Sequence, residues 1–199
     1  MSWERAVRTE RGLPAEVARV LDMHDATRDS RLLFGVPEHR VALVGGSRAS
    51  QTDLWVVLKT PDGLASVAVE AKAREPFGQT LNEWLRDASE GKRMRLKSLC
   101  ETLGLHPVEA SGLRYQLFHR AASTVLEASR IGAQTAVLLV QNFFAESIAW
   151  PDFQAFSRLF DVEACRDGVC AARCPGVDRL LFAWVDSAVA TDAELASLA

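Results

Sequence analysis

Two acidic residues and one lysine stand in a pattern that suits chemistry. Asp53 begins the apolar run DLWVVLKT, and Glu70 and Lys72 lie two residues apart near the end of the next run, LASVAVEAK. The PDG between these runs is typical of a tight hairpin turn. Because alternate residues of a strand point to the same face, Glu70 and Lys72 face the same side. The sequence therefore predicts two carboxylates and an ammonium on paired strands.

The hairpin turn sets which side chains meet. A two-residue loop at Asp62 and Gly63 places Asp53 opposite Lys72 and makes Glu70 its diagonal neighbour. The other faces of both strands are then wholly apolar, as a core face should be. Diagonal neighbours are roughly 7–8 Å apart, so the two carboxylates can reach a shared ion.

Two neighbouring carboxylates repel each other unless a positive charge lies between them. Mg²⁺ or Mn²⁺ would supply it, because such ions take oxygen ligands and use one or two carboxylates with several waters. The carbonyl oxygen of Ala71 offers a further ligand. Lys72 can activate a metal-bound water or stabilise charge on a phosphate, which suits phosphodiester hydrolysis. The alternative is a solvated sheet face, because Glu-x-Lys is common on strands.

The surrounding sequence predicts an α/β fold with a mixed central sheet flanked by helices. Thr80 and Glu83 form a capping-box pattern, Ser111 is a predicted helix cap, and Gly104 and Gly132 are predicted helix ends. The predicted helices span residues 15–24, 81–91, 92–105, 113–131 and 151–160, and the predicted strands span 39–46, 53–60, 64–72, 134–143 and 177–186.

Composition is that of one globular domain over residues 1–199. Apolar residues make up 48% of the chain and the formal charge is −3, which excludes a disordered tail and does not indicate nucleic-acid binding by the chain as a whole. No apolar run is long enough to span a membrane, and the charged start has no secretory pattern, so a cytoplasmic location is expected. The four cysteines are then expected to be free thiols.

Asp53 followed by VEAK resembles the motif of the PD-(D/E)XK nuclease superfamily, with Thr52 where that motif usually has proline. The superfamily has a restriction-endonuclease-like core with the order helix, three strands, helix, strand. Longer stretches, including GGSRASQTDLW, VEAKAREPFG and RYQLFHRAAS, resemble a bacterial family of uncharacterised proteins associated with that superfamily. The resemblance implies that Asp53 and Glu70 bind Mg²⁺ or Mn²⁺ and that Lys72 is the catalytic lysine.

The resemblance also implies further site residues. The superfamily often adds an acidic metal ligand from the first helix, for which Glu16 is the candidate here. It often adds polar residues from the helix after the third strand, where Gln116 and Arg120 lie one turn apart on one face. Arg120 would grip a phosphate through its planar guanidinium. The alternative for this pair is an ordinary surface helix.

Two functions remain open from the sequence. One is a metal-dependent nuclease acting on DNA or RNA, and the other is a noncatalytic domain of the same architecture that binds nucleic acid or protein. The sequence does not set the oligomeric state. A modest basic patch is the candidate contact for a phosphate backbone, although such runs are commonly a solvated helix face. Its residues are Arg86, Lys92, Arg93, Arg95, Lys97 and Arg114.

Overall fold

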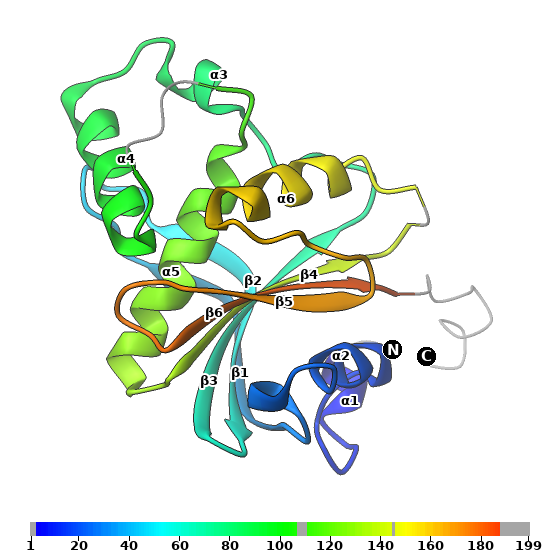
Figure 1. Ribbon diagram of the computed structural model, residues 1–199. Coiled ribbons are helices and arrows are strands. Elements are labelled where there is room, and N and C mark those ends of the chain that lie inside the picture. The colour runs from blue at the N-terminus through cyan, green and yellow to red at the C-terminus, as the bar shows by residue number, and fades with distance from the viewer. Residues whose placement is uncertain (1–2, 107–110, 145, 188–199) are drawn as a thin grey trace.

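A six-stranded mixed sheet forms the centre of the computed structural model, which describes residues 3–106, 111–144 and 146–187 (Figure 1). The strand order is β1-β2-β3-β4-β6-β5. The first three strands are antiparallel, β3, β4 and β6 are parallel, and β5 is antiparallel to β6. The strands are β1 (Arg31–Val41), β2 (Ser50–Thr60), β3 (Gly63–Lys72), β4 (Thr135–Asn142), β5 (Gly168–Ala172) and β6 (Arg179–Asp186).

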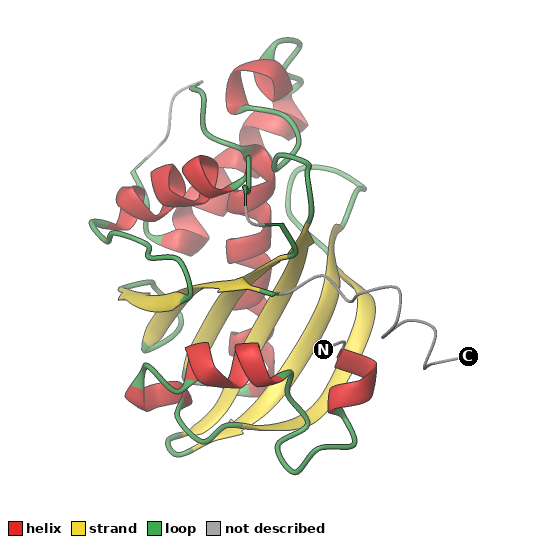
Figure 2. Ribbon diagram, turned by 90° about the vertical axis from the view of Figure 1, so that its right-hand side faces the viewer, coloured by secondary structure: helices red, strands yellow, loops and turns green. Residues whose placement is uncertain are grey.

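Helices cover both faces of this sheet, as Figures 1 and 2 show. The N-terminal helices lie on one face, and the long helix α5 crosses the other with α4 and α6 beside it. The helices are α1 (Trp3–Ala6), α2 (Ala15–Leu21), α3 (Leu81–Leu85), α4 (Glu90–Leu103), α5 (Tyr115–Ile131) and α6 (Trp150–Ser157), with short 3₁₀ turns η1 (Asp25–Thr27) and η2 (Arg158–Phe160).

The alternation of side chains along the central strands divides the core into two clusters. Ala68 and Leu138 pack with α4, α5 and α6, in what we call the α5-side cluster. Val67 and Leu139 pack with α2, in what we call the α2-side cluster. Burial on both faces explains why β4 is a continuous apolar run rather than an alternating one. Polar side chains at the ends of these strands therefore stand out from the apolar pattern.

The hairpin between β2 and β3 has a different register from the predicted one. Thr60 pairs with Gly63 and Leu54 pairs with Val69, so the turn consists of Pro61 and Asp62. Proline is favoured at the first central position of a turn and glycine at the last, which explains the choice. The shift is two residues, so each side chain keeps its predicted face.

Strand β1 is longer than the sequence predicted and lies at one edge of the sheet. The predicted strand began at residue 39 and ran to 46, whereas β1 begins at Arg31 and ends at Val41. A bulge at Leu33 interrupts its pairing with β2, Pro37 lies within it, and Glu38 has φ 53°. The edge position tolerates these irregularities, because one side of the strand needs no partner.

Other local predictions met mixed outcomes. The capping box of Thr80 and Glu83 is confirmed, and Gly104 and Gly132 end their helices in the left-handed conformation. Ser111 does not cap α5, whose N-cap residue is Arg114 without a side-chain hydrogen bond. Strand β5 was missed, because its five residues lie in a short stretch that reads as a cysteine-containing loop.

The described part of the chain contains no helix long and apolar enough to cross a bilayer. None of the four cysteines, all of which lie in the described part of the chain, forms a disulfide. Cys170 and Cys174 have pKa values raised to about 11 by burial, so neither carries appreciable thiolate at neutral pH.

Arg95 ties the loop between β1 and β2 to helix α4. Its guanidinium donates to the carbonyl oxygens of Leu43, Val44 and Gly46 at 3.3, 3.0 and 3.0 Å. The loop approaches α4 so closely that a Cβ on Gly45, which has φ 83°, would lie 2.4 Å from a backbone oxygen of the helix. Only glycine fits at this position, and the loop is therefore part of the packed structure.

We predict that Gly45→Ala destabilises the protein by more than about 1 kcal/mol, because it combines left-handed backbone with a steric clash. Gly112→Ala is the control, since a Cβ there meets no atom within 4 Å. Urea denaturation of both variants checks this. Equal stability of the two variants would contradict the close packing of the loop.

Candidate functional site

A group of polar side chains meets at the carboxyl end of β3. Glu70 and Lys72 are the last residues of that strand whose side chains are buried. Asp53 lies near the start of the antiparallel strand β2, which is at the same end of the sheet. The first turns of α5 supply Gln116 and Arg120. Ligands of open α/β sheets usually bind outside the carboxyl ends of the strands, so the location suits a site.

The Glu70 carboxylate is the centre of this group. Its side chain is almost completely buried, with 2% of the residue exposed. Oε2 accepts a hydrogen bond from Nε of Arg120 at 2.6 Å, and Oε1 accepts one from Nζ of Lys72 at 3.1 Å. The amide of Gln116 also donates to Oε1. A buried charge needs such partners, and here two cations surround one anion.

Lys72 is buried as deeply as its partner. Only 5% of the residue is exposed, and Nζ lies 4.9 Å from the ring centroid of Phe77. The ammonium is thus held between a carboxylate and an aromatic face. In this position the ammonium would also attract an anionic group bound next to Glu70.

Asp53 completes the acidic pair and is only half-buried. Continuing the observed register by one residue places it directly opposite Glu70 rather than diagonal to it. Oδ2 accepts a hydrogen bond from the backbone N–H of Ala71 at 2.7 Å. Burial and the charge of Glu70 raise the pKa of Asp53, although Ala71, Arg120 and Lys72 act in the opposite direction. A cation beside Asp53 would relieve this repulsion.

Arg120 is a buried member of the network and not an exposed helix residue. Besides binding Glu70, it donates from Nη1 to Oγ of Ser50 at 3.2 Å. The sequence alternative of an ordinary surface helix therefore does not describe this residue. Gln116, one turn earlier, reaches the same carboxylate, as the shared helical face predicts.

Glu16 is the one predicted site residue that the structure does not bring to the group. It lies in the first turn of α2, which packs against the α2-side cluster. Its carboxylate hydrogen-bonds the hydroxyl of Ser187, which also accepts from Gln141 at 2.9 Å. Glu70 faces the α5-side cluster, so the sheet separates the two carboxylates.

The structure adds two residues that the sequence did not single out, Ser50 and His119. Oγ of Ser50 lies 2.8 Å from Nδ1 of His119, and Nη1 of Arg120 approaches the same nitrogen at 3.4 Å. Burial, with Arg120 and Arg95 nearby, lowers the pKa of His119 to about 3. The ring is therefore neutral at physiological pH. Only tertiary packing reveals this contact, because 69 residues separate the pair.

Asn142 is a third addition, next to Lys72 in the parallel pairing of β3 and β4. Its Nδ2 donates to Oδ1 of Asp186 at 2.7 Å and to the carbonyl oxygen of Phe144 at 2.5 Å. These two acceptors fix the orientation of the amide. Its Oδ1 is buried and has no hydrogen-bond partner among the described residues, which is unusual for a native structure.

A hard divalent cation at this site would be held mainly by water. Asp53 and Glu70 would supply the carboxylates, and within the described ranges no group of three or more His, Cys, Asp or Glu residues is arranged to hold a metal ion. Mg²⁺ commonly uses only one or two carboxylates, so this count suffices. The oxygens of Glu70 would have to exchange part of their present hydrogen bonding for the ion.

Not all six residues of the predicted basic patch offer an exposed and unpaired charge. Arg95 is buried under the loop after β1, Lys92 donates to the carbonyl oxygen of Trp84 at 2.7 Å, and Arg114 pairs with Asp152 at 2.9 Å. Arg86 and Arg93 are exposed and form no salt bridge with any residue that the structure describes.

We predict that Arg120→Met destabilises the protein by about 3 kcal/mol, because it leaves the buried Glu70 charge undercompensated. Combining it with Glu70→Gln should recover more than about 1 kcal/mol relative to the sum of the single changes. Urea denaturation of the three variants measures this coupling, with exposed Arg93→Met as a control of unchanged stability. Additive effects would show that the pair is not coupled.

We predict that Asp53→Asn stabilises the protein at neutral pH. The pKa of Asp53 is higher in the folded than in the unfolded chain, so stability falls as pH rises from about 4 through the folded value. Asparagine keeps an acceptor for Ala71 and removes the charge, so Tm at pH 7 should rise by about 1–2 °C. The gain should vanish below pH 4 in thermal melts, and a gain that persists there would contradict a charge effect.

Comparison with known proteins places the chain in one family. The model of the family described as "Domain of unknown function (DUF6946)" matches residues 1–189, nearly the whole chain. No curated protein matches the chain, and no solved structure matches it.

Proposed function

The chain belongs to the family described as a domain of unknown function (DUF6946), and we propose that it is a Mg²⁺- or Mn²⁺-dependent nuclease of the PD-(D/E)XK type. It would hydrolyse phosphodiester bonds in DNA or RNA. The restriction-endonuclease-like core and the superfamily membership are parts of this proposal. The mixed sheet with helices on both faces is compatible with them.

One observation carries the proposal. Asp53, Glu70 and Lys72 come together at one edge of the sheet, and Lys72 is hydrogen-bonded to Glu70 while both are buried. A buried lysine and carboxylate are costly to maintain for stability alone, because well-packed apolar residues often serve a core as well or better. The pKa of Asp53 beside them is raised by burial and by the charge of Glu70, and a perturbed pKa is typical of a functional site.

The site residues have distinct roles in this proposal. A bound divalent cation would supply a polarised water and offset negative charge on the phosphate. Asp53 and Glu70 would hold that cation. Lys72, released from Glu70, would place its ammonium against the non-bridging oxygens of the phosphate, where negative charge grows.

Arg120 and Gln116 are positioning residues in this scheme, because both act through Glu70. The bond from Arg120 fixes Oε2 and leaves Oε1 facing Lys72. His119 is neutral and hydrogen-bonded to Ser50, so it does not compete for the carboxylate. The order of the site thus depends on α5, which supplies all three side chains.

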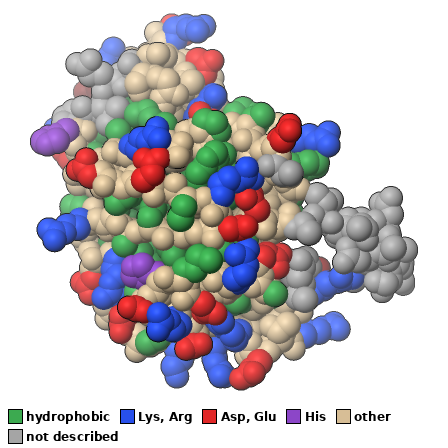
Figure 3. Space-filling view, turned by 45° about the vertical axis from the view of Figure 1, so that its right-hand side comes forward, with side chains coloured by type: hydrophobic (Ala, Val, Ile, Leu, Met, Phe, Trp, Pro, Cys, Tyr) green, Lys and Arg blue, Asp and Glu red, His purple; other side chains and the backbone are tan. Residues whose placement is uncertain are grey.

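A noncatalytic domain that binds nucleic acid or protein is the second candidate. The observation in its favour is that both oxygens of Glu70 already have partners, which also describes a purely structural network. The surface in Figure 3 intersperses cationic and anionic side chains, which does not favour tight nonspecific binding to a polyanion.

We predict that the purified protein cleaves at least one of three substrates, circular DNA, linear DNA or RNA, in the presence of Mg²⁺ or Mn²⁺. Lys72→Ala should reduce the rate by about 10²–10³-fold, because it removes a charge that stabilises the transition state. Gel electrophoresis of time courses measures the rate.

Calorimetric titration with Mn²⁺ is the companion measurement. Wild type should bind the ion and Asp53→Asn should bind it at least about tenfold more weakly, since one of two carboxylates is lost. Absence of cleavage on all three substrates together with absence of metal binding would overturn the nuclease proposal in favour of the noncatalytic domain.

A further inference from the structure

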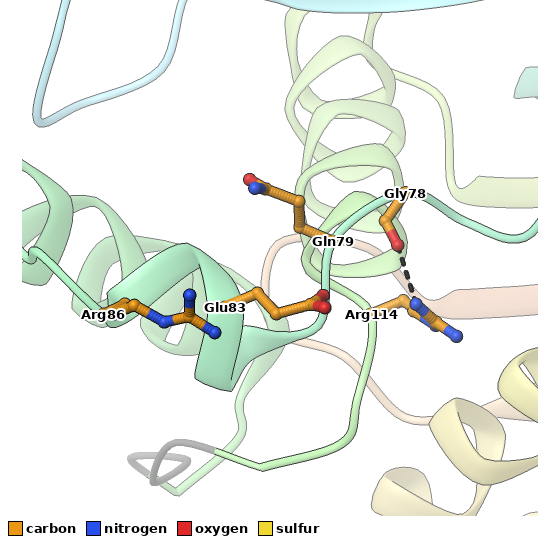
Figure 4. A pocket seen from close by; sticks show the side chains of 5 residues that line it. All are labelled: Gly78, Gln79, Glu83, Arg86 and Arg114. Atoms are coloured by element: carbon orange, nitrogen blue, oxygen red, sulfur yellow. Dashed lines mark hydrogen bonds between the residues drawn. The ribbon is translucent and has the colours of Figure 1, made fainter.

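A surface pocket of about 390 Å³ is lined by residues that are near those of the Glu70 group in the sequence. Its lining residues are Gly78, Gln79, Glu83, Arg86 and Arg114 (Figure 4). We propose that this pocket holds a backbone phosphate of the nucleic-acid strand, next to the phosphate that is cleaved. This inference rests on the proposed function and names a substrate contact outside the Asp53, Glu70 and Lys72 group.

The chain connects the pocket to the site on two sides. The segment after β3 carries Phe77, which packs under the Lys72 ammonium, and continues directly into Gly78 and Gln79. On the other side, Arg114 precedes α5 by one residue and Gln116 by two. The pocket is thus joined to the site through Phe77, which contacts Lys72, and through Gln116, which contacts Glu70.

Arg114 is held in a fixed position at the pocket wall. Its Nε donates to Asp152 at 2.9 Å and its Nη1 donates to the carbonyl oxygen of Gly78 at 2.8 Å, as Figure 4 shows for the second bond. These bonds leave Nη2 without a partner among the described residues. A donor fixed in advance costs little ordering on binding, which suits recognition of an anion.

Arg86 and Gln79 supply the adaptable side of the pocket. Both are exposed, and neither side chain forms a hydrogen bond or salt bridge with any residue in the described ranges. Arginine recognises phosphate through two parallel N–H bonds, and the amide of Gln79 adds a neutral donor. The pocket therefore has unused donors from three side chains.

Glu83 is the opposing charge and provides a sharp test. Its Oε2 is turned onto the backbone N–H and hydroxyl of Thr80 at 2.8 and 3.0 Å. These bonds lower the pKa of Glu83, so it stays ionised. Glu83→Gln preserves the capping box, which accepts glutamine at this position, and removes one negative charge from the pocket.

Two variants of pocket residues test the proposal, because they should change Kd in opposite directions. Binding of fluorescein-labelled 20-nucleotide DNA and RNA strands is measured by anisotropy in EDTA, where a metal-dependent enzyme does not cleave. Arg86→Ala should raise Kd roughly fivefold and reduce the slope of log K against log salt by about 1. Glu83→Gln should lower Kd by roughly twofold to fivefold through the lost repulsion.

Arg8→Ala is the matched control, because it removes an exposed arginine that precedes α2, the helix on the opposite face of the sheet. It should leave both Kd and the salt slope unchanged. Equal Kd values for Arg86→Ala, Arg8→Ala and wild type would overturn the pocket even if wild type cleaves. Failure of wild type to bind either strand would also overturn it, whereas the cleavage assay judges the nuclease proposal separately.

Discussion

The buried carboxylate of Glu70 constrains everything around it. An ionised group without water must be surrounded by donors, and this protein provides them from its own strand through Lys72 and from α5 through Gln116 and Arg120. The helix therefore cannot shift or rotate on the sheet without leaving a charge uncompensated. The apolar packing of α5 and this polar network require the same placement of the helix.

Further hydrogen bonds surround the residues that contact Glu70 directly. Ser50 binds both His119 and Arg120, which links the start of β2 to α5. Arg95 ties the preceding loop to α4 through three carbonyl oxygens. These contacts connect segments that are far apart in sequence, and those of Arg95 fix backbone that has no regular structure. The residues around the candidate site are thus linked by polar contacts to β2 and α5.

Much of the site was predictable because strands and helices have fixed side-chain periods. The two-residue spacing of Glu70 and Lys72 and the four-residue spacing of Gln116 and Arg120 determine faces without any tertiary information. The predicted hairpin register differs from the observed one by two residues. Because side chains alternate with a period of two, each residue was still assigned to the correct face of the sheet. The placement of Glu16 failed, because no local pattern tells which side of a sheet a helix covers. Ser50 and Asn142 were missed, because their contacts arise only from long-range packing.

The irregular edge strand β1 has a consequence for how copies of this protein meet. An edge strand offers unpaired backbone groups onto which another chain can add. Here Pro37 lacks an N–H, Glu38 turns the backbone into the left-handed region, and the bulge at Leu33 breaks the repeat. A neighbouring molecule would find no long uninterrupted row of donors and acceptors. The exposed apolar side chains of this strand therefore lie on a backbone whose irregularities disfavour pairing with a further strand.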